Sequence, residues 1–144
     1  MIAGVATGGI AHGALVAHDL GLPFIYVRSG NKEHGLKNQV EGDLTVGRNV
    51  VVVEDLVSTG GSSLNAVQAL RDAGVEVKGM VSIFTYGFDE ANKAFAAAKV
   101  KLHALTNYSV LLDQALRSDY ITEKDVVSLN EWRKDPAGWD AVQA

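Results

Sequence analysis

Four consecutive valines, Val50 to Val53, are the feature that most constrains how this chain of 144 residues can fold. β-Branched side chains favour strands, and an unbroken apolar run is typical of a parallel strand that is buried on both faces. Two acids, Glu54 and Asp55, follow the valines, and a stretch rich in hydroxyl groups and glycine extends from Ser58 to Ser63. The residues after it predict a helix over 61–73 that ends at Gly74.

Strand and helix patterns alternate along the rest of the chain. Strands are predicted at 2–6, 23–27, 75–85 and 101–105, and helices at 10–20, 89–98, 108–116 and 123–133. Such alternation is typical of a parallel sheet with right-handed crossovers. We therefore expect an α/β fold: one domain over 1–144, with a parallel, Rossmann-like sheet and helices on both faces. Residues 28–47 lack apolar periodicity and predict a long loop, which in a small domain is often functional.

Composition narrows the classes of partner. The formal net charge is -4, and the absence of a basic run argues against a nucleic-acid-binding face. No apolar run is long enough to span a membrane, and the first residues do not read as a signal peptide. The chain has no cysteine, which excludes disulfides and thiolate metal sites and is compatible with a cytoplasmic location.

The valine strand leads directly into candidate binding groups. Ligands of open α/β sheets bind at the carboxyl ends of the strands, where Glu54 and Asp55 can hold hydroxyl groups or a metal. The turn at 58–63 can direct backbone N–H groups at an anion, aided by the dipole of the next helix. The alternative is a capped helix beside two solvated acids, but neighbouring acids at the end of an apolar strand favour a site. Together these groups predict a site for a phosphorylated sugar.

The segment 50–63 resembles the phosphoribosyl-diphosphate (PRPP) signature of the type I phosphoribosyltransferases. Strand, acid pair, Thr-Gly-Gly turn and helix come in the same order. The turn Thr7-Gly8-Gly9, a weak signal by itself, then looks like that family's pyrophosphate-binding loop. The spacing Arg28-x-x-x-Lys32-x-His34-Gly is similar to the catalytic loop of the orotate branch of the family, and the resemblance covers essentially the full 144 residues.

The resemblance implies a glycosyltransferase that transfers the phosphoribosyl group of PRPP to orotate in pyrimidine biosynthesis, with Mg²⁺ as cofactor. It implies catalytic roles for Lys32, His34 and Asp55. It also implies that the substrate is bound by Arg28, Glu54, Asp55, Leu56, Val57, Ser58, Thr59, Gly60, Gly61, Ser62, Thr7 and Gly8. Mg²⁺ would be carried by PRPP, with Asp55 as the candidate protein ligand, and a homodimer would let the loop 28–42 cross to the partner's site. Two alternatives remain: a purine-type phosphoribosyltransferase, and a non-catalytic regulator that binds PRPP or a nucleotide.

Three departures from the family pattern set further expectations. Ser29 stands where many members have a lysine, and no arginine stands in the segment 84–87, from which the family often contacts the base. Residues that contact orotate are therefore not assigned. The family also has an N-terminal hood segment ahead of the first core strand, which this sequence lacks. Without it, we expect weak transfer activity and an uncovered apolar surface.

Overall fold

The computed structural model describes residues 1–28 and 39–139. In those residues six strands form one sheet in the order β3-β2-β1-β4-β5-β6. All neighbouring strands run parallel except the pair β2 and β3. The strands are β1 (Ile2–Val5), β2 (Phe24–Val27), β3 (Val40–Glu41), β4 (Asn49–Val57), β5 (Glu76–Thr85) and β6 (Leu102–Asn107). The helices are α1 (Gly8–Asp19), a 3₁₀ helix (Leu44–Val46), α2 (Gly61–Asp72), α3 (Asp89–Ala97), α4 (Tyr108–Arg117) and α5 (Glu123–Lys134).

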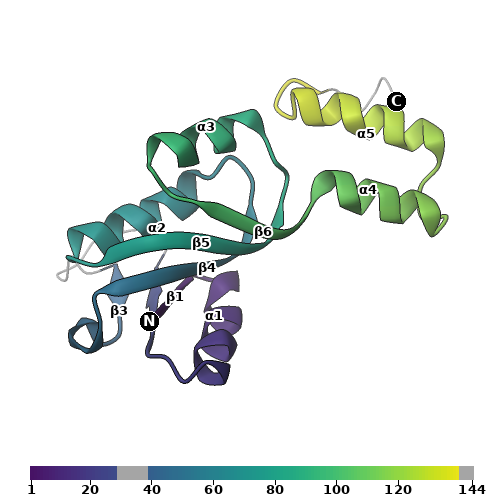
Figure 1. Cartoon of the computed structure of the whole chain (residues 1–144). Helices are drawn as coiled ribbons and strands as arrows, with labels where there is room; N and C mark the ends of the chain where they lie inside the picture. Colours follow the sequence, from purple (N-terminus) through teal and green to yellow (C-terminus); the bar gives the residue numbers. More distant parts are fainter. Residues whose placement is uncertain (29–38, 140–144) are drawn as a thin grey trace.

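The helices cover the sheet from both sides, which confirms the α/β fold predicted from the sequence. Helix α1 lies on one face, and α2 and α3 lie on the other (Figure 1). Most boundaries lie within one or two residues of the prediction, and two differences are larger. Strand β4 continues through the acid pair to Val57, because its ladder with β5 continues as far as the pair Val57 and Thr85. The predicted loop 28–47 contains β3, whose residues pair antiparallel with the end of β2.

The valine strand β4 lies inside the sheet between β1 and β5. Val50 and Val52 are fully buried in the larger core cluster, together with Leu70 of α2. Val53 belongs to a smaller cluster that includes Ala17 of α1. The alternation of a β-strand therefore sends successive side chains of β4 toward opposite helical layers.

The sheet face beside α1 carries a groove of about 660 Å³, lined mostly by apolar side chains of α1, β1, β4, β5 and β6 and by a few polar residues. Several of these side chains are exposed, among them Leu15 at 68%, Leu20 at 60% and Leu105 at 75%. This exposure distinguishes this face from the α2 side of the sheet, where strand residues such as Val50 and Val52 are fully covered.

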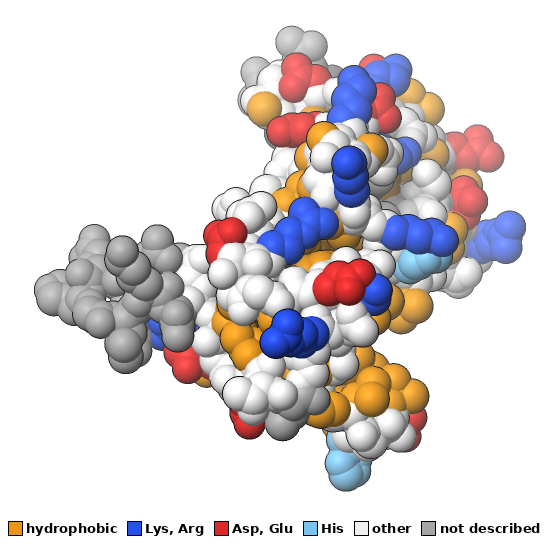
Figure 2. All heavy atoms as spheres, turned by 60° about the vertical axis from the view of Figure 1, so that its left-hand side comes forward, with side chains coloured by type: hydrophobic (Ala, Val, Ile, Leu, Met, Phe, Trp, Pro, Cys, Tyr) orange, Lys and Arg blue, Asp and Glu red, His pale blue; other side chains and the backbone are white. Residues whose placement is uncertain are grey.

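The last two helices extend beyond the carboxyl end of β6 (Figure 1). Helix α5 begins with a capping box between Thr122 and Asp125, and it contains no buried residue. On the face seen in Figure 2, described acidic and basic side chains are interspersed, and they do not separate by sign. Among the described helices, none is long and apolar enough to cross a membrane.

Candidate functional site

The site predicted from the sequence lies at the carboxyl ends of the central strands, which form the carboxyl edge of the sheet. Strands β1, β4 and β5 are parallel, so the turns that follow them meet at their carboxyl ends. The turn after β1 carries Thr7 and Gly8, and the turn after β4 carries residues 58–60. Of the predicted binding residues, Thr7, Gly8, Thr59, Gly61 and Ser62 are exposed at this edge.

The turn before α2 depends on Gly60. Its φ is +86°, a left-handed conformation that glycine adopts without strain. A Cβ at this position would also lie 2.8 Å from Cε2 of Phe95, so the turn packs closely on α3. No side chain caps the start of α2, and the first backbone N–H groups of a helix have no partner within the helix. The turn can therefore present N–H groups and the positive end of the helix dipole to an anion.

The first acid, Glu54, points into the protein. Its side chain is only 4% exposed, and its Oε2 accepts a hydrogen bond of 2.9 Å from the hydroxyl of Ser63 in α2. Its Oε1 accepts a bond of 3.1 Å from the backbone N–H of Asp55. Burial, with a hydrogen bond to the Asp55 side chain, raises the pKa of Glu54 from 4.5 to about 7. Glu54 is therefore protonated below neutral pH and fastens β4 to the first turn of α2.

The second acid, Asp55, lies at the open edge. Its side chain is half-buried, and a Cβ added to Gly8 would overlap its carboxylate. The hydrogen bond from Glu54 lowers the pKa of Asp55, so this carboxylate stays charged at neutral pH. The two acids thus differ in role: Glu54 is buried, and Asp55 offers negative charge beside the first turn.

The first turn is narrow because Gly8 faces Asp55 without a side chain. Helix α1 begins at Gly8, and no side chain caps its start at Thr7. The peptide bond between Ala6 and Thr7 is cis. The exposed backbone of Thr7 and Gly8 thus lies beside Asp55, as the sequence predicts for groups that bind one ligand.

Other predicted site residues are placed differently. Arg28 directly follows β2 and forms an ion pair with Glu41 of β3, with 3.3 Å between Nε and Oε1. Leu56 is 42% exposed, whereas Val57 is fully buried and belongs to the core. Because the side chain of Val57 is buried, only the backbone of Val57 can contribute to ligand binding. Lys32 and His34 lie outside the described residues.

Two residues near the site were not assigned from the sequence. Ser63 closes the predicted turn, but only its hydrogen bond to Glu54 reveals its part in holding the acid. Arg133 of α5 donates from Nε to the carbonyl of Tyr86 and from Nη2 to that of Gly87, each over 3.1 Å. This arginine therefore reaches the end of β5, where the strand itself has none. No local pattern signals a contact over this separation in the chain.

Asp55 is also the residue whose chemistry fits a metal. Mg²⁺ prefers oxygen ligands, and it is often held by one or two carboxylates together with substrate phosphates and water. The charged, partly exposed carboxylate of Asp55 matches that preference. Within 1–28 and 39–139, no three acidic or histidine side chains gather into a metal-binding group.

Comparison with known proteins gives one family. The model of the phosphoribosyl transferase domain matches residues 1–107. The chain is 64% identical over 140 residues to an orotate phosphoribosyltransferase of Bacteroides thetaiotaomicron, covering 97% of this chain and 66% of that relative. It is 53% identical over 139 residues to the enzyme of that name from Listeria innocua, with 96% and 66% covered. The chain thus spans slightly less than two thirds of the length of these relatives.

Solved structures agree with the sequence relatives. An orotate phosphoribosyltransferase from Aeropyrum pernix superposes with a TM-score of 0.71 at 34% identity, over 78% of this chain and 63% of that one. A Mycobacterium tuberculosis orotate phosphoribosyltransferase in complex with PRPP superposes with a TM-score of 0.63 at 26% identity, over 75% and 62%.

Proposed function

We propose that this chain, which belongs to the phosphoribosyl transferase family, transfers the phosphoribosyl group of PRPP to orotate. The products would be orotidine 5′-monophosphate and pyrophosphate, in pyrimidine nucleotide biosynthesis. The observation that carries the proposal is the juxtaposition of the uncapped start of α2, the charged Asp55 and the narrow turn at Gly8. The names of relatives at 64% and 53% identity support orotate as the acceptor.

Each part of the edge suits one part of PRPP. The 5-phosphate would accept hydrogen bonds from the backbone N–H groups at the start of α2, near Ser58 to Ser62. Asp55 would accept from the ribose hydroxyls, while Glu54 holds the strand end in place through Ser63. The pyrophosphate would lie at the exposed turn of Thr7 and Gly8. The order of these groups along the edge supports one extended ligand.

The reaction needs positioning and charge stabilisation rather than a protein nucleophile. As the bond at C1 of the ribose breaks, positive charge develops on the sugar ring and negative charge on the departing pyrophosphate. Asp55 carries the negative charge that stabilises the ring. Lys32 and His34 would neutralise or protonate the leaving group, and Arg28 would add a cation at the end of β2. Removing one such contact lowers the rate of transfer by roughly 10²–10³-fold.

Mg²⁺ is the cofactor that this proposal includes. Asp55 would hold it together with oxygens of PRPP, and the ion would offset the charge of the pyrophosphate. Asp55 therefore has two tasks, orienting the ribose hydroxyls and keeping a hard oxygen ligand at the edge.

We further infer a homodimer in which the loop 28–42 of one copy reaches the site of the other. Its support is the spacing of Arg28, Lys32 and His34 in the sequence and the position of Arg28 at the sheet edge. Since the chain has no cysteine, we also propose the reducing cytoplasm as its location.

The test is pyrophosphate release by the purified chain with Mg²⁺ and PRPP. Orotate, adenine and hypoxanthine are compared as acceptors, and PRPP binding is measured separately by calorimetry. Turnover with orotate alone supports the proposal, and turnover with a purine would replace it with the purine-type activity. PRPP binding without turnover on any base would favour a regulator.

A further inference from the structure

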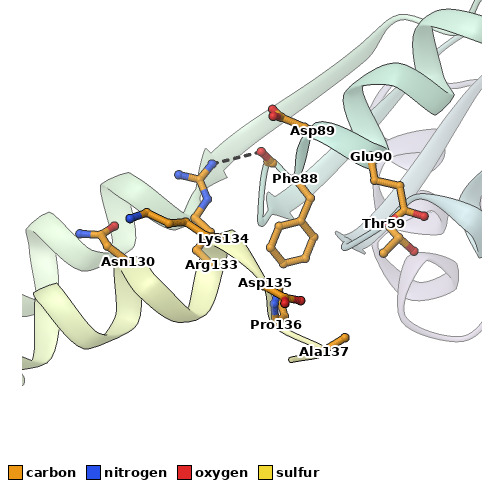
Figure 3. Close-up of a pocket in the computed structure, with 11 residues that line it drawn as sticks. Thr59, Phe88, Asp89, Glu90, Asn130, Arg133, Lys134, Asp135, Pro136 and Ala137 are labelled. Carbon is orange, nitrogen blue, oxygen red and sulfur yellow. Dashed lines mark hydrogen bonds between the residues drawn. The ribbon is translucent and has the colours of Figure 1, made fainter. Parts of the chain in front are cut away.

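Two hollows reach the carboxyl end of β4. One has a volume of about 800 Å³ and lies between the phosphate turn (residues 58–62), the start of α3 and the end of α5, as Figure 3 shows. The other is the groove of about 660 Å³ beside α1, and Glu54 lines it. The wall of this groove also contains His12, a residue that the proposed function does not use.

Helix α1 turns one face toward this groove. It contributes His12, Leu15 and Val16 to the wall, and residues three or four positions apart in a helix lie on the same side. Leu15 and Val16 are apolar, so the polar group of this face is the imidazole of His12. His18, on the same helix, is exposed and does not line the groove. The two histidines of α1 therefore have different surroundings.

Asp55 points toward the same side of the sheet. Val51 and Val53 line the groove, and the side chains of a strand alternate between its two faces. Strand β4 continues to Val57, so Asp55 is the next residue in the row that contains Val51 and Val53. Its carboxylate thus lies on the α1 side of the sheet, whereas Glu54 points toward α2.

Gly8 brings this face of α1 close to the carboxylate. A Cβ added to Gly8 would overlap the carboxylate of Asp55. His12 follows Gly8 by four residues, so it lies on the same side of the helix, one turn further along. Side chains of a helix lean toward its N-terminus, and Gly8 has no side chain to stand between the imidazole and the carboxylate. This arrangement directs His12 toward Asp55.

The electrostatics of Asp55 agree with this placement. The pKa of Asp55 is lowered chiefly by the hydrogen bond from Glu54, and a positive charge on His12 lowers it further. Within the described part of the chain no direct ion pair joins His12 to Asp55, so the two groups are near each other without touching. A separation of this kind suits a bridging water, which can link two polar groups nearly as well as a direct hydrogen bond.

We propose that His12 is a positioning residue for Asp55: its imidazole N–H holds the carboxylate through a bridging water and so fixes the orientation in which Asp55 meets the ribose hydroxyls. The inference rests on the proposed function, because that function gives Asp55 its ligand. A neutral imidazole has one N–H donor and a charged imidazole has two, so the link does not require a charged His12. Glu54 and His12 would restrain the carboxylate from two sides and leave its open side to the ligand.

The test is a cycle of four proteins: the unaltered chain, His12→Leu, Asp55→Asn and the double variant. Calorimetry measures the dissociation constant of PRPP with Mg²⁺ for each full chain. His12→Leu should weaken binding roughly three- to tenfold, because Asp55 loses a restraint. In the Asp55→Asn background the same change should weaken binding less than about twofold, since no carboxylate is left to position.

Further variants separate positioning from a general effect on α1. His12→Gln keeps an N–H donor and should restore part of the affinity. His18→Leu removes an exposed histidine of the same helix outside the groove, and it should bind PRPP like the unaltered chain. Melting temperatures show whether each variant remains folded, and His12→Ala replaces His12→Leu in the cycle if the leucine variant melts early.

A second readout needs no ligand. Three-bond NMR couplings between Cγ of Asp55 and the backbone report the χ1 rotamer of this side chain. We expect one dominant rotamer in the unaltered chain and an average over several rotamers in His12→Leu. Equal couplings in the two proteins would mean that His12 does not orient the carboxylate, and the inference would be overturned.

The inference and the proposed function can fail separately. Equal losses of PRPP affinity with and without the carboxylate of Asp55, or no loss in either background, overturn the inference and leave the proposed function standing. PRPP binding that shows the expected dependence on both residues, without transfer to any base, keeps the inference and overturns the proposed function. If the unaltered chain binds no PRPP, the proposed function falls, and the χ1 couplings of Asp55 decide the inference.

Discussion

The buried acid Glu54 should make the stability of this protein depend on pH in a way that one substitution removes. The pKa of Glu54 rises from 4.5 to about 7 on folding, because the carboxyl group loses water. Between those values the folded protein binds a proton that the unfolded chain releases. The stability from the protonated acid is thus complete below pH 4.5 and is lost as the pH rises through about 7.

The size of this effect follows from the two pKa values. At about 1.4 kcal/mol per pH unit, the difference between 4.5 and about 7 corresponds to about 3 kcal/mol. Glu54→Gln mimics the protonated acid: its amide oxygen can accept from the N–H of Asp55, and its NH₂ group can donate to the hydroxyl of Ser63. We therefore expect near-equal stability of the two proteins at low pH. The variant should be more stable by roughly 2–3 kcal/mol at pH 8.

Urea unfolding followed by circular dichroism at several pH values between 5 and 8 measures the difference. The quantity of interest is the free energy of unfolding of the variant minus that of the unaltered chain, because contributions common to both proteins cancel in this difference. Glu90→Gln, at an exposed position, is the control and should give a difference that does not change with pH. Parallel curves for the unaltered chain and Glu54→Gln would mean that Glu54 does not titrate in this range, and the reasoning from its burial would be wrong.

Four further substitutions test the site. Gly60→Ala should abolish PRPP binding in calorimetry, whereas Gly74→Ala, with a similar positive φ of +80° and open space around it, should cost about 1 kcal/mol of stability and keep binding. Asp55→Asn should slow transfer by roughly 10²–10³-fold, and normal turnover at saturating substrate would show that Asp55 has no catalytic role. Lys32→Ala should lower kcat more than PRPP affinity, since its contact strengthens as pyrophosphate leaves; an equal loss in both would place it in ground-state binding. Mixing Lys32→Ala chains with Gly60→Ala chains should restore part of the activity if loops cross between copies, and efficient subunit exchange without recovery would show that each loop serves its own site.

The central strand and the turn after it can be predicted from the sequence because the residues that define them are neighbours in the chain. A valine run, two acids and a glycine-rich turn each have a structural meaning within a few residues. The alternation of a strand also predicts the orientation of Glu54. Val50, Val52 and Glu54 are every second residue, so their side chains point to the same face, toward α2. The valine run by itself predicts a strand that ends at residue 53, so it leaves out the buried acid Glu54. Its partner, Ser63, shows how the acid is accommodated.

The role of Arg133 could not be read in the same way. Its partners at Tyr86 and Gly87 lie far back in the sequence, and no periodicity of α5 indicates which strand end the helix meets. The aromatic cluster that fixes the helix is equally dispersed, since Trp132 contacts Tyr86, Phe88 and Tyr108. Contacts of this kind arise from the whole topology, and sequence alone provides only their separate residues.

The acids and the phosphate turn are held by the core of the sheet, whereas α5 is held by a few contacts, and this difference has an evolutionary consequence. The acids and the phosphate turn belong to a strand in the middle of the sheet, where most changes would disturb the core. Helix α5 has no buried residue and is joined to the sheet edge by one arginine and a few aromatic rings. Mutations in it can accumulate with little cost to folding. A lineage built on this plan can change its appended helix, and with it the neighbouring cavity, while the ancestral sugar-phosphate edge remains the same.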